Sequence, residues 1–212
     1  MAPLKVETYR VGPVQTNCYF AINDDTKETL LIDPGADAGK LVEIIEKEKL
    51  NPLAILLTHG HFDHAGAVSQ LAKHFGIKVY AEEHEAETLE NPGLNLSGWT
   101  GVEESYHADV FLRDEQEIDL AGFHIRVLFT PGHTVGGCCY YFSYQDALFS
   151  GDTLFAQSVG RTDFPRGNAQ QLIRSIREKL LVLPDAVTVY AGHEESTTIG
   201  AERMYNPYLQ GV

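Results

Sequence analysis

The stretch that decides the fold is Thr58-His59-Gly60-His61-Phe62-Asp63-His64, which places four potential metal ligands within six consecutive positions. It follows the apolar run 53–57, which is typical of a buried strand, and precedes apolar residues at helical spacing over 65–75. Imidazole nitrogens and carboxylate oxygens suit zinc or iron at neutral pH. Surface turns are built mainly from Gly, Asn, Asp, Ser and Pro, so an ordinary turn would not explain three histidines. The stretch therefore predicts a metal-binding loop at the end of a core strand.

Three later segments repeat this design, in which an apolar strand is followed by glycine and a ligand-type side chain. They end in Gly132-His133, Gly151-Asp152 and Gly192-His193. Taken alone, each of these side chains would be an ordinary loop residue. Because four strand ends all carry such side chains, the sequence predicts that they converge on one site built on a rigid scaffold.

The four segments, in this order, resemble the metallo-β-lactamase superfamily over nearly the whole chain. Asp33-Pro34-Gly35 and the stretch 160–164 make the sequence most similar to the glyoxalase II (hydroxyacylglutathione hydrolase) branch and its short bacterial relatives. Glyoxalase II enzymes carry a helical domain after the last ligand, whereas this sequence ends at Val212, so we expect the short form that lacks it. Glu194 and Glu195 would also repel an anionic substrate.

The resemblance implies a centre with two divalent metal ions. Zinc is the expected metal, and iron or a mixed zinc and iron pair are the alternatives. Three protein ligands and a shared oxygen would leave a position open for water at each metal. Asp63 and Asp152 are the expected catalytic carboxylates. Carried over residue by residue, the family pattern assigns His59, His61 and His133 to one metal, Asp63, His64 and His193 to the other, and Asp152 to both.

Ligand histidines need an acceptor for their second ring nitrogen, and Asp33 and Asp163 are the candidates for this supporting role. The alternatives are turn formation for Asp33 and helix capping for Asp163. Arg161 either binds a substrate carboxylate or pairs with Asp163 or Asp152, since its guanidinium makes planar bidentate pairs with carboxylates.

The resemblance implies a metal-dependent hydrolase that cleaves a small acyl thioester by attack of a metal-bound hydroxide. A lactonase would use the same dinuclear centre. A persulfide dioxygenase would bind one iron through the residues that match His59, His133 and Asp152. A β-lactamase is disfavoured, because those enzymes generally lack the bridging aspartate. An inactive metal-binding scaffold is disfavoured by the presence of all seven ligand-type residues.

The composition of the sequence limits the kinds of molecule that the protein is expected to bind and where it is expected to act. The 212 residues, 43% of them hydrophobic, can form one domain over 1–212, and no run approaches the ~20 apolar residues of a membrane span. Three cysteines, two of them adjacent, predict a reducing, cytoplasmic location. A net charge of −14 argues against nucleic acid and favours a small-molecule substrate. The sequence does not determine the oligomeric state.

The expected fold is α+β, an αββα sandwich of two mixed β-sheets with helices on the outer faces, which is the architecture that the resemblance implies. Loop 91–107, around Trp99, either borders the site or packs on the surface. Helices are expected over 38–49, 65–75, 168–181 and 197–204. Strands are expected near 4–11, 17–23, 28–33, 53–57, 77–81, 108–112, 122–129, 138–143, 146–150 and 187–191.

Overall fold

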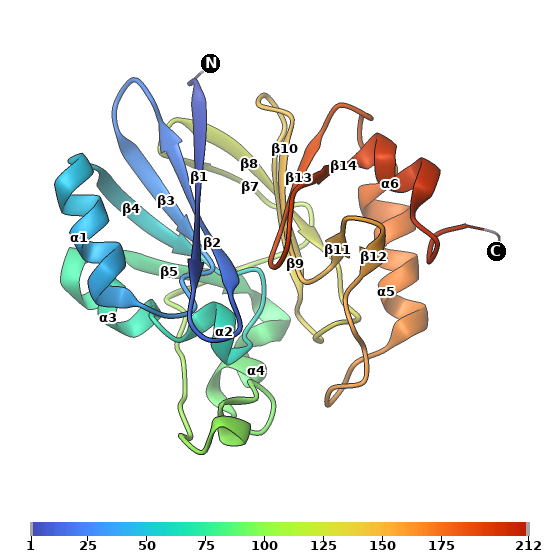
Figure 1. The fold of residues 1–212 in the computed structure, drawn as a ribbon, viewed down its shortest axis with the longest axis horizontal. Coiled ribbons are helices and arrows are strands. Elements are labelled where there is room, and N and C mark those ends of the chain that lie inside the picture. The colour runs from blue at the N-terminus through green and yellow to red at the C-terminus, as the bar shows by residue number, and fades with distance from the viewer. Residues whose placement is uncertain (1, 211–212) are drawn as a thin grey trace.

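The computed structural model describes residues 2–210, which form two six-stranded mixed sheets (Figure 1). In the first sheet the strands lie side by side in chain order. Strands β1 to β3 are antiparallel, whereas β3 to β6 are parallel. The members are β1 (Leu4–Val11), β2 (Thr16–Asn23), β3 (Glu28–Ile32), β4 (Asn51–Leu56), β5 (Lys78–Glu82) and β6 (Val110–Leu112).

The second sheet has the order β14-β13-β10-β9-β8-β7, and only β10 and β13 pair in parallel. A small hairpin of β11 (Leu154–Phe155) and β12 (Ser158–Val159) follows β10. The strands of the sheet are β7 (Glu117–Leu120), β8 (Phe123–Phe129), β9 (Cys138–Phe142), β10 (Ala147–Gly151), β13 (Thr188–Ala191) and β14 (Thr197–Thr198).

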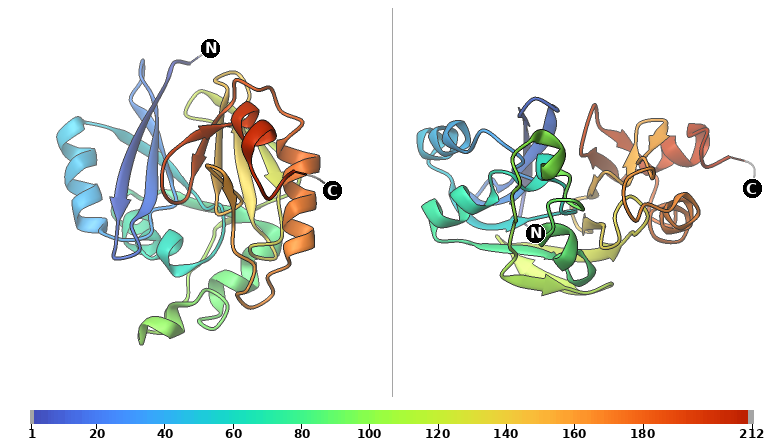
Figure 2. Two further views of the ribbon diagram at one scale, coloured as in Figure 1. Left: turned by 45° about the vertical axis from the view of Figure 1, so that its right-hand side comes forward. Right: turned by 90° about the horizontal axis from the view of Figure 1, so that it is seen from below.

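Helices cover the outer faces of both sheets, as the two views of Figure 2 show. Helices α1 (Ala38–Glu48) and α3 (Val68–Phe75) lie outside the first sheet, and α5 (Ala169–Ser175) and α6 (Ile199–Tyr205) lie outside the second. The expected α+β sandwich of two mixed sheets is confirmed. The remaining helical turns are η1 (Glu83–Glu85), α2 (Phe62–Ala65), α4 (Ala86–Glu90), η2 (Ser97–Thr100) and the π-helical η3 (Ile176–Leu180).

Three layers of apolar side chains hold the sandwich together. Along β2, Phe20 and Ile22 pack in the layer under α1 and α3, whereas Tyr19 and Ala21 pack between the two sheets. Successive side chains of a strand point to opposite faces, so the central residues 18–22 of this strand are all apolar because both faces are covered. A third layer lies between the second sheet and α5, where Leu148 meets helical side chains.

The structure corrects several expected boundaries. The helix expected over 65–75 breaks after Ala65, because the Ala67 amide donates to the Pro34 carbonyl. Asp63 and His64 therefore lie on the short helix α2 rather than on a loop. Helix 168–181 is α-helical only to Ser175 and then continues as the π-helical turn η3. The short strands β7, β11, β12 and β14 were not expected, since they are polar or only two residues long.

None of the helices within residues 2–210 has the length and apolar character that crossing a membrane requires.

Candidate metal centre and active-site cleft

All seven expected ligand residues meet at one edge of the sandwich. Each of β4, β8, β10 and β13 delivers a ligand shortly after its last residue, because the carboxyl ends of these strands point to the same edge. Helix α2 carries two further ligands, Asp63 and His64, and His61 lies in the turn just before this helix. The set comprises His59, His61, Asp63, His64, His133, Asp152 and His193, most of them buried.

One group of three imidazoles is closely packed. Nδ1 of His61 lies 3.1 Å from Nε2 of His59 and 3.0 Å from Nε2 of His133. Three ring nitrogens that face a common point match the donor set of a catalytic metal site that keeps a position open. The sequence-based grouping of these three histidines agrees with this geometry.

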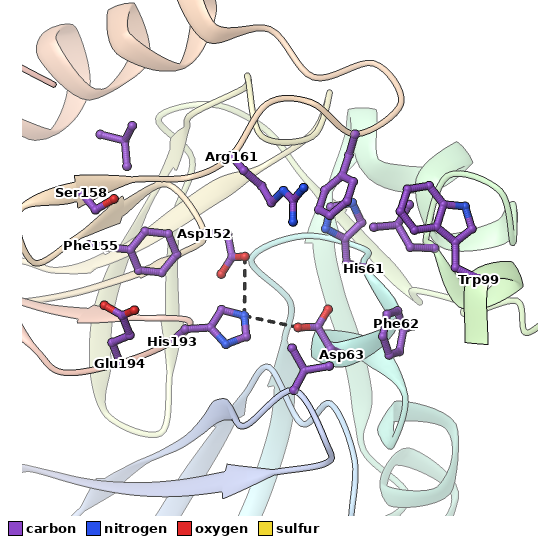
Figure 3. A pocket seen from close by; sticks show the side chains of 14 residues that line it. His61, Phe62, Asp63, Trp99, Asp152, Phe155, Ser158, Arg161, His193 and Glu194 are labelled. Atoms are coloured by element: carbon purple, nitrogen blue, oxygen red, sulfur yellow. Dashed lines mark ion pairs between the residues drawn. The ribbon is translucent and has the colours of Figure 1, made fainter.

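Asp63, His64 and His193 form the second group, and Asp152 lies between the two (Figure 3). Nε2 of His193 lies 3.3 Å from Oδ2 of Asp63. Oδ1 of Asp152 lies 3.3 Å from Nε2 of His64, and its Oδ2 lies 3.5 Å from Nε2 of His133 and 3.6 Å from Nε2 of His193. One carboxylate therefore faces both groups, as a bridging ligand would.

Two unpartnered atoms show that this arrangement fits a metal. Nε2 of His64 and Oδ1 of Asp152 are buried and, although they lie 3.3 Å apart, they make no hydrogen bond with each other or with any other described residue. Buried polar atoms in native proteins are nearly always paired, and orphaned ones need an explanation such as an ion. A pair of divalent cations would satisfy both atoms and offset the clustered carboxylates.

The protonation states point the same way. Burial lowers the pKa of His59 well below its usual range and that of His61 to about 3, so both rings are neutral and free to coordinate at pH 7. Burial also opposes a charge on His64, yet the nearby carboxylates, above all Asp63 and Asp152, raise its pKa. The first group thus offers neutral nitrogens, whereas the second attracts positive charge.

Glycine at two of the strand ends makes the convergence of ligands possible. A Cβ on Gly192 would lie 2.3 Å from Oδ1 of Asp152 and 2.7 Å from Cε1 of His64. Gly151 has a φ of 48°, and a Cβ there would lie 2.1 Å from Oγ1 of Thr58. The repeated pattern of glycine before a ligand therefore reflects close approach of the backbone to neighbouring ligand loops.

Asp33 orients ligand histidines in both groups, although it is not itself one of the seven ligand residues. Its Oδ2 lies 2.9 Å from Nδ1 of His64 and accepts a 2.7 Å hydrogen bond from Oγ1 of Thr58, while Oδ1 accepts from the Thr58 amide. The same Thr58 hydroxyl lies 3.1 Å from Nδ1 of His59. Asp33 thus orients one histidine directly and another through Thr58, in the position that the sequence suggested for it.

Asp163 does not contact a ligand histidine, so the supporting role expected for it is corrected. Nδ1 of His133 lies 2.7 Å from the Arg161 carbonyl, which takes that role instead. The Asp163 carboxylate accepts two 2.7 Å hydrogen bonds from the Arg161 guanidinium. Of the alternatives for Arg161, the structure shows the pair with Asp163.

Sequence reasoning missed the residues that hold the ligand loops together. Asn17 donates through its amide group to the carbonyls of Ala191 and Glu194, on either side of His193. Glu85 is fully buried and accepts from the amides of Gly60 and Gly136 and from the Thr134 hydroxyl. It therefore ties the loop of His59 and His61 to the loop of His133. Burial raises the pKa of Glu85 to about 7, although these three hydrogen bonds lower it.

Glu85→Ala is expected to destabilise the metal-free protein by about 3 kcal/mol, because three buried donors lose their acceptor. Chemical denaturation at constant pH measures the loss. Glu83→Ala is the matched control in the same turn, since Glu83 is exposed and pairs with Arg113 alone among residues 2–210, and such surface pairs contribute little. Equal stabilities for the two variants would show that Glu85 does not tie the loops together.

A cleft of about 520 Å³ opens directly onto the centre. Asp63, Asp152 and His193 form its floor, and Arg161 lies at its rim (Figure 3). Leu96 and Trp99 form part of its wall, so loop 91–107 borders the site rather than packing elsewhere on the surface.

The family follows from comparison with known proteins. Residues 11–193 match the model of the metallo-beta-lactamase superfamily, and the chain belongs to this superfamily. Hydroxyacylglutathione hydrolase GloC of Haemophilus influenzae is 40% identical over 209 residues, which cover 97% of this chain and 98% of that protein. The resemblance to the glyoxalase II-like branch is therefore confirmed.

Two solved structures agree in fold. The BLEG-1 B3 metallo-beta-lactamase has a TM-score of 0.93 and 44% identity, with 98% of this chain and 100% of that chain covered. TTHA1623 in a di-iron-bound form has a TM-score of 0.83 and 36% identity, with 96% and 100% covered. The chain therefore has the metallo-β-lactamase fold, with a cluster of histidine and aspartate side chains placed to bind metal.

Proposed function

We propose that this protein is a thioesterase whose two divalent metals, zinc or iron, are held by the two ligand groups and bridged by Asp152. The position of Asp152 between His64, His133 and His193 is the observation that carries the proposal. The similarity to a hydroxyacylglutathione hydrolase, whose substrate class is a thioester, supports the choice of reaction.

The completeness of both groups favours two metals over the single iron of a dioxygenase. A one-iron site would need only His59, His133 and Asp152. In this structure Nδ1 of His61 lies within 3.1 Å of both histidine nitrogens of that set. The second group is also complete, with its own pair of histidines and a carboxylate.

The protein's own side chains prepare the reaction. Bound divalent ions supply a nucleophile at neutral pH, by lowering the pKa of water, and polarise a carbonyl. Thr16 donates a 2.8 Å hydrogen bond to Oδ2 of Asp63. Burial alone would raise the pKa of the Asp63 carboxyl group, but in the metal-free site the nearby charge of His64 outweighs burial and lowers it. Asp63 is thus a fixed, ionised acceptor beside the cleft, able to orient a water molecule.

The cleft favours a substrate with a good leaving group. Without metal, burial opposes the ionised forms of Asp63 and Asp152, yet the charge of a protonated His64 lowers the pKa of both carboxyl groups. Bound cations would take over that role and also favour the ionised forms, so neither carboxyl group can serve as a general acid at neutral pH. A thiolate leaves without prior protonation, whereas an ordinary amine requires it. A thioester therefore matches the chemistry that these residues can support.

A second candidate function is β-lactam hydrolysis, favoured by the similarity to the BLEG-1 structure. A strained lactam ring also opens without strong acid catalysis. The presence of the bridging aspartate Asp152 argued against a β-lactamase in the sequence. Both candidate reactions would use the same metal centre and differ only in the substrate.

Parallel assays of metal-loaded protein separate these functions. We expect release of free thiol from simple acyl thioesters, abolished by a chelator and restored by zinc or iron. Faster opening of a chromogenic cephalosporin than of any thioester would support the second candidate. Oxygen uptake with a persulfide, without thioester cleavage, would contradict both.

A further inference from the structure

The wall of the cleft is apolar on both sides of the metal centre. Phe62, Trp99 and Phe164 line one side, and Phe155 and Val159 line the other. Figure 3 shows Trp99 and Phe62 across the catalytic carboxylates from Phe155. A concave site with apolar walls and a few polar groups at its floor is typical of small-molecule recognition.

Trp99 is the most exposed of these side chains, with 67% of its surface accessible. Its ring meets that of Phe164 edge-on at 5.5 Å, and Phe164 meets His61 at 5.6 Å. A continuous aromatic surface therefore runs from solvent to the first group of ligands. Large apolar side chains left exposed beside a reaction centre mark a surface that a ligand covers.

Away from the metal centre, the side chains that line the cleft offer little free positive charge to an anionic group. Arg161 is the one cation among the described residues that line it, apart from any protonated histidine, and both oxygens of Asp163 already hold its guanidinium. Its face lies over Phe164 at 4.1 Å. Glu194 adds a negative charge at the rim. An uncharged acyl group is thus favoured over a carboxylate-bearing one.

We propose that this cleft selects thioesters with a medium-length apolar or aromatic acyl group, which packs on Trp99 and Phe164 while its carbonyl reaches the metal centre. The inference rests on the proposed thioesterase function and specifies its substrate class. Burial of each additional methylene on these walls favours the longer chain. Short hydroxyacyl groups would leave most of the apolar wall uncovered.

A series of thioesters of one uncharged thiol, N-acetylcysteamine, tests the selection. From acetyl through butanoyl and hexanoyl to octanoyl, kcat/KM is expected to rise by about threefold per methylene. Trp99→Ala should flatten this slope to below twofold. Tyr144→Ala is the control and should keep it, since Tyr144 is an exposed aromatic in the turn between β9 and β10, at the ends opposite Asp152.

Fluorescence gives a readout that does not depend on turnover, because Trp99 is the only tryptophan in the sequence. Saturation with the S-octyl thioether of N-acetylcysteamine should shift its emission to shorter wavelength, whereas the S-ethyl thioether should cause a smaller shift or none. No shift with either thioether, together with equal kcat/KM across the ester series, would overturn the inference and leave the thioesterase function intact.

Two further outcomes separate this inference from the proposed function. A shift with the octyl thioether and no cleavage of any ester would refute the thioesterase function while supporting an apolar binding cleft. S-lactoylglutathione cleaved more than tenfold faster than the octanoyl ester, with the advantage lost in Arg10→Ala, would overturn the inference. Arg10 lines an adjoining hollow with Glu194 and Glu195 and could hold an anionic leaving group there.

Discussion

Replacing Asp152 by alanine is expected to lower kcat/KM for thioesters by about a thousandfold or more and to reduce the metal content below two per chain. Asp152 approaches His64, His133 and His193 within 3.3 to 3.6 Å. Without it, two cations would face each other with less negative charge between them. Steady-state kinetics and elemental analysis of the purified variant measure both effects.

Asp63→Ala provides the comparison for this prediction. Asp63 approaches only the second group, with Oδ2 3.3 Å from His193 Nε2 and 3.7 Å from His64 Nε2. We therefore expect this variant to keep the metal of the three-histidine group and to lose less activity than Asp152→Ala. If Asp152→Ala kept two metals and near-normal turnover, the bridging assignment would be wrong.

Asp33→Ala is expected to weaken metal binding by about 10- to 100-fold, although Asp33 is not itself a ligand. Its buried carboxylate orients His64 directly and His59 through Thr58. Both ligand groups should therefore bind metal less tightly. Competition with a chromogenic chelator would measure the two dissociation constants, and both are expected to rise.

Asp163→Ala is the matched control, since the sequence presented both aspartates as supports for ligand histidines. Asp163 is exposed, and its one ion-pair partner in the described part of the chain is Arg161. The variant should bind metal as the wild-type protein does. Equal losses in the two variants would contradict the supporting role of Asp33.

The ligand set and the fold could be predicted from the sequence because both follow from local patterns. Apolar runs fix the strands, and a glycine before Asp152 or His193 marks a strand end that approaches its neighbours closely. The break after Ala65 was not predictable in this way, because the hydrogen bond from Ala67 to Pro34 joins two distant segments.

The supporting residues illustrate the same limit. Glu85 contacts Gly60 and Gly136, and Asn17 contacts residues more than 170 positions away. No local pattern marks such pairs. Asp163 was assigned wrongly because the acceptor for His133 is the main-chain carbonyl of Arg161, and residue types give no information about main-chain acceptors.

A two-metal centre bridged by Asp152 is tested most directly by counting the metal ions that the protein binds. Metal-free protein would be titrated with zinc and, under anaerobic conditions, with iron(II), while calorimetry follows binding and elemental analysis follows retention after gel filtration. The structure predicts two equivalents per chain for the wild-type protein. Saturation at one equivalent, with His64 and His193 dispensable for it, would contradict the account.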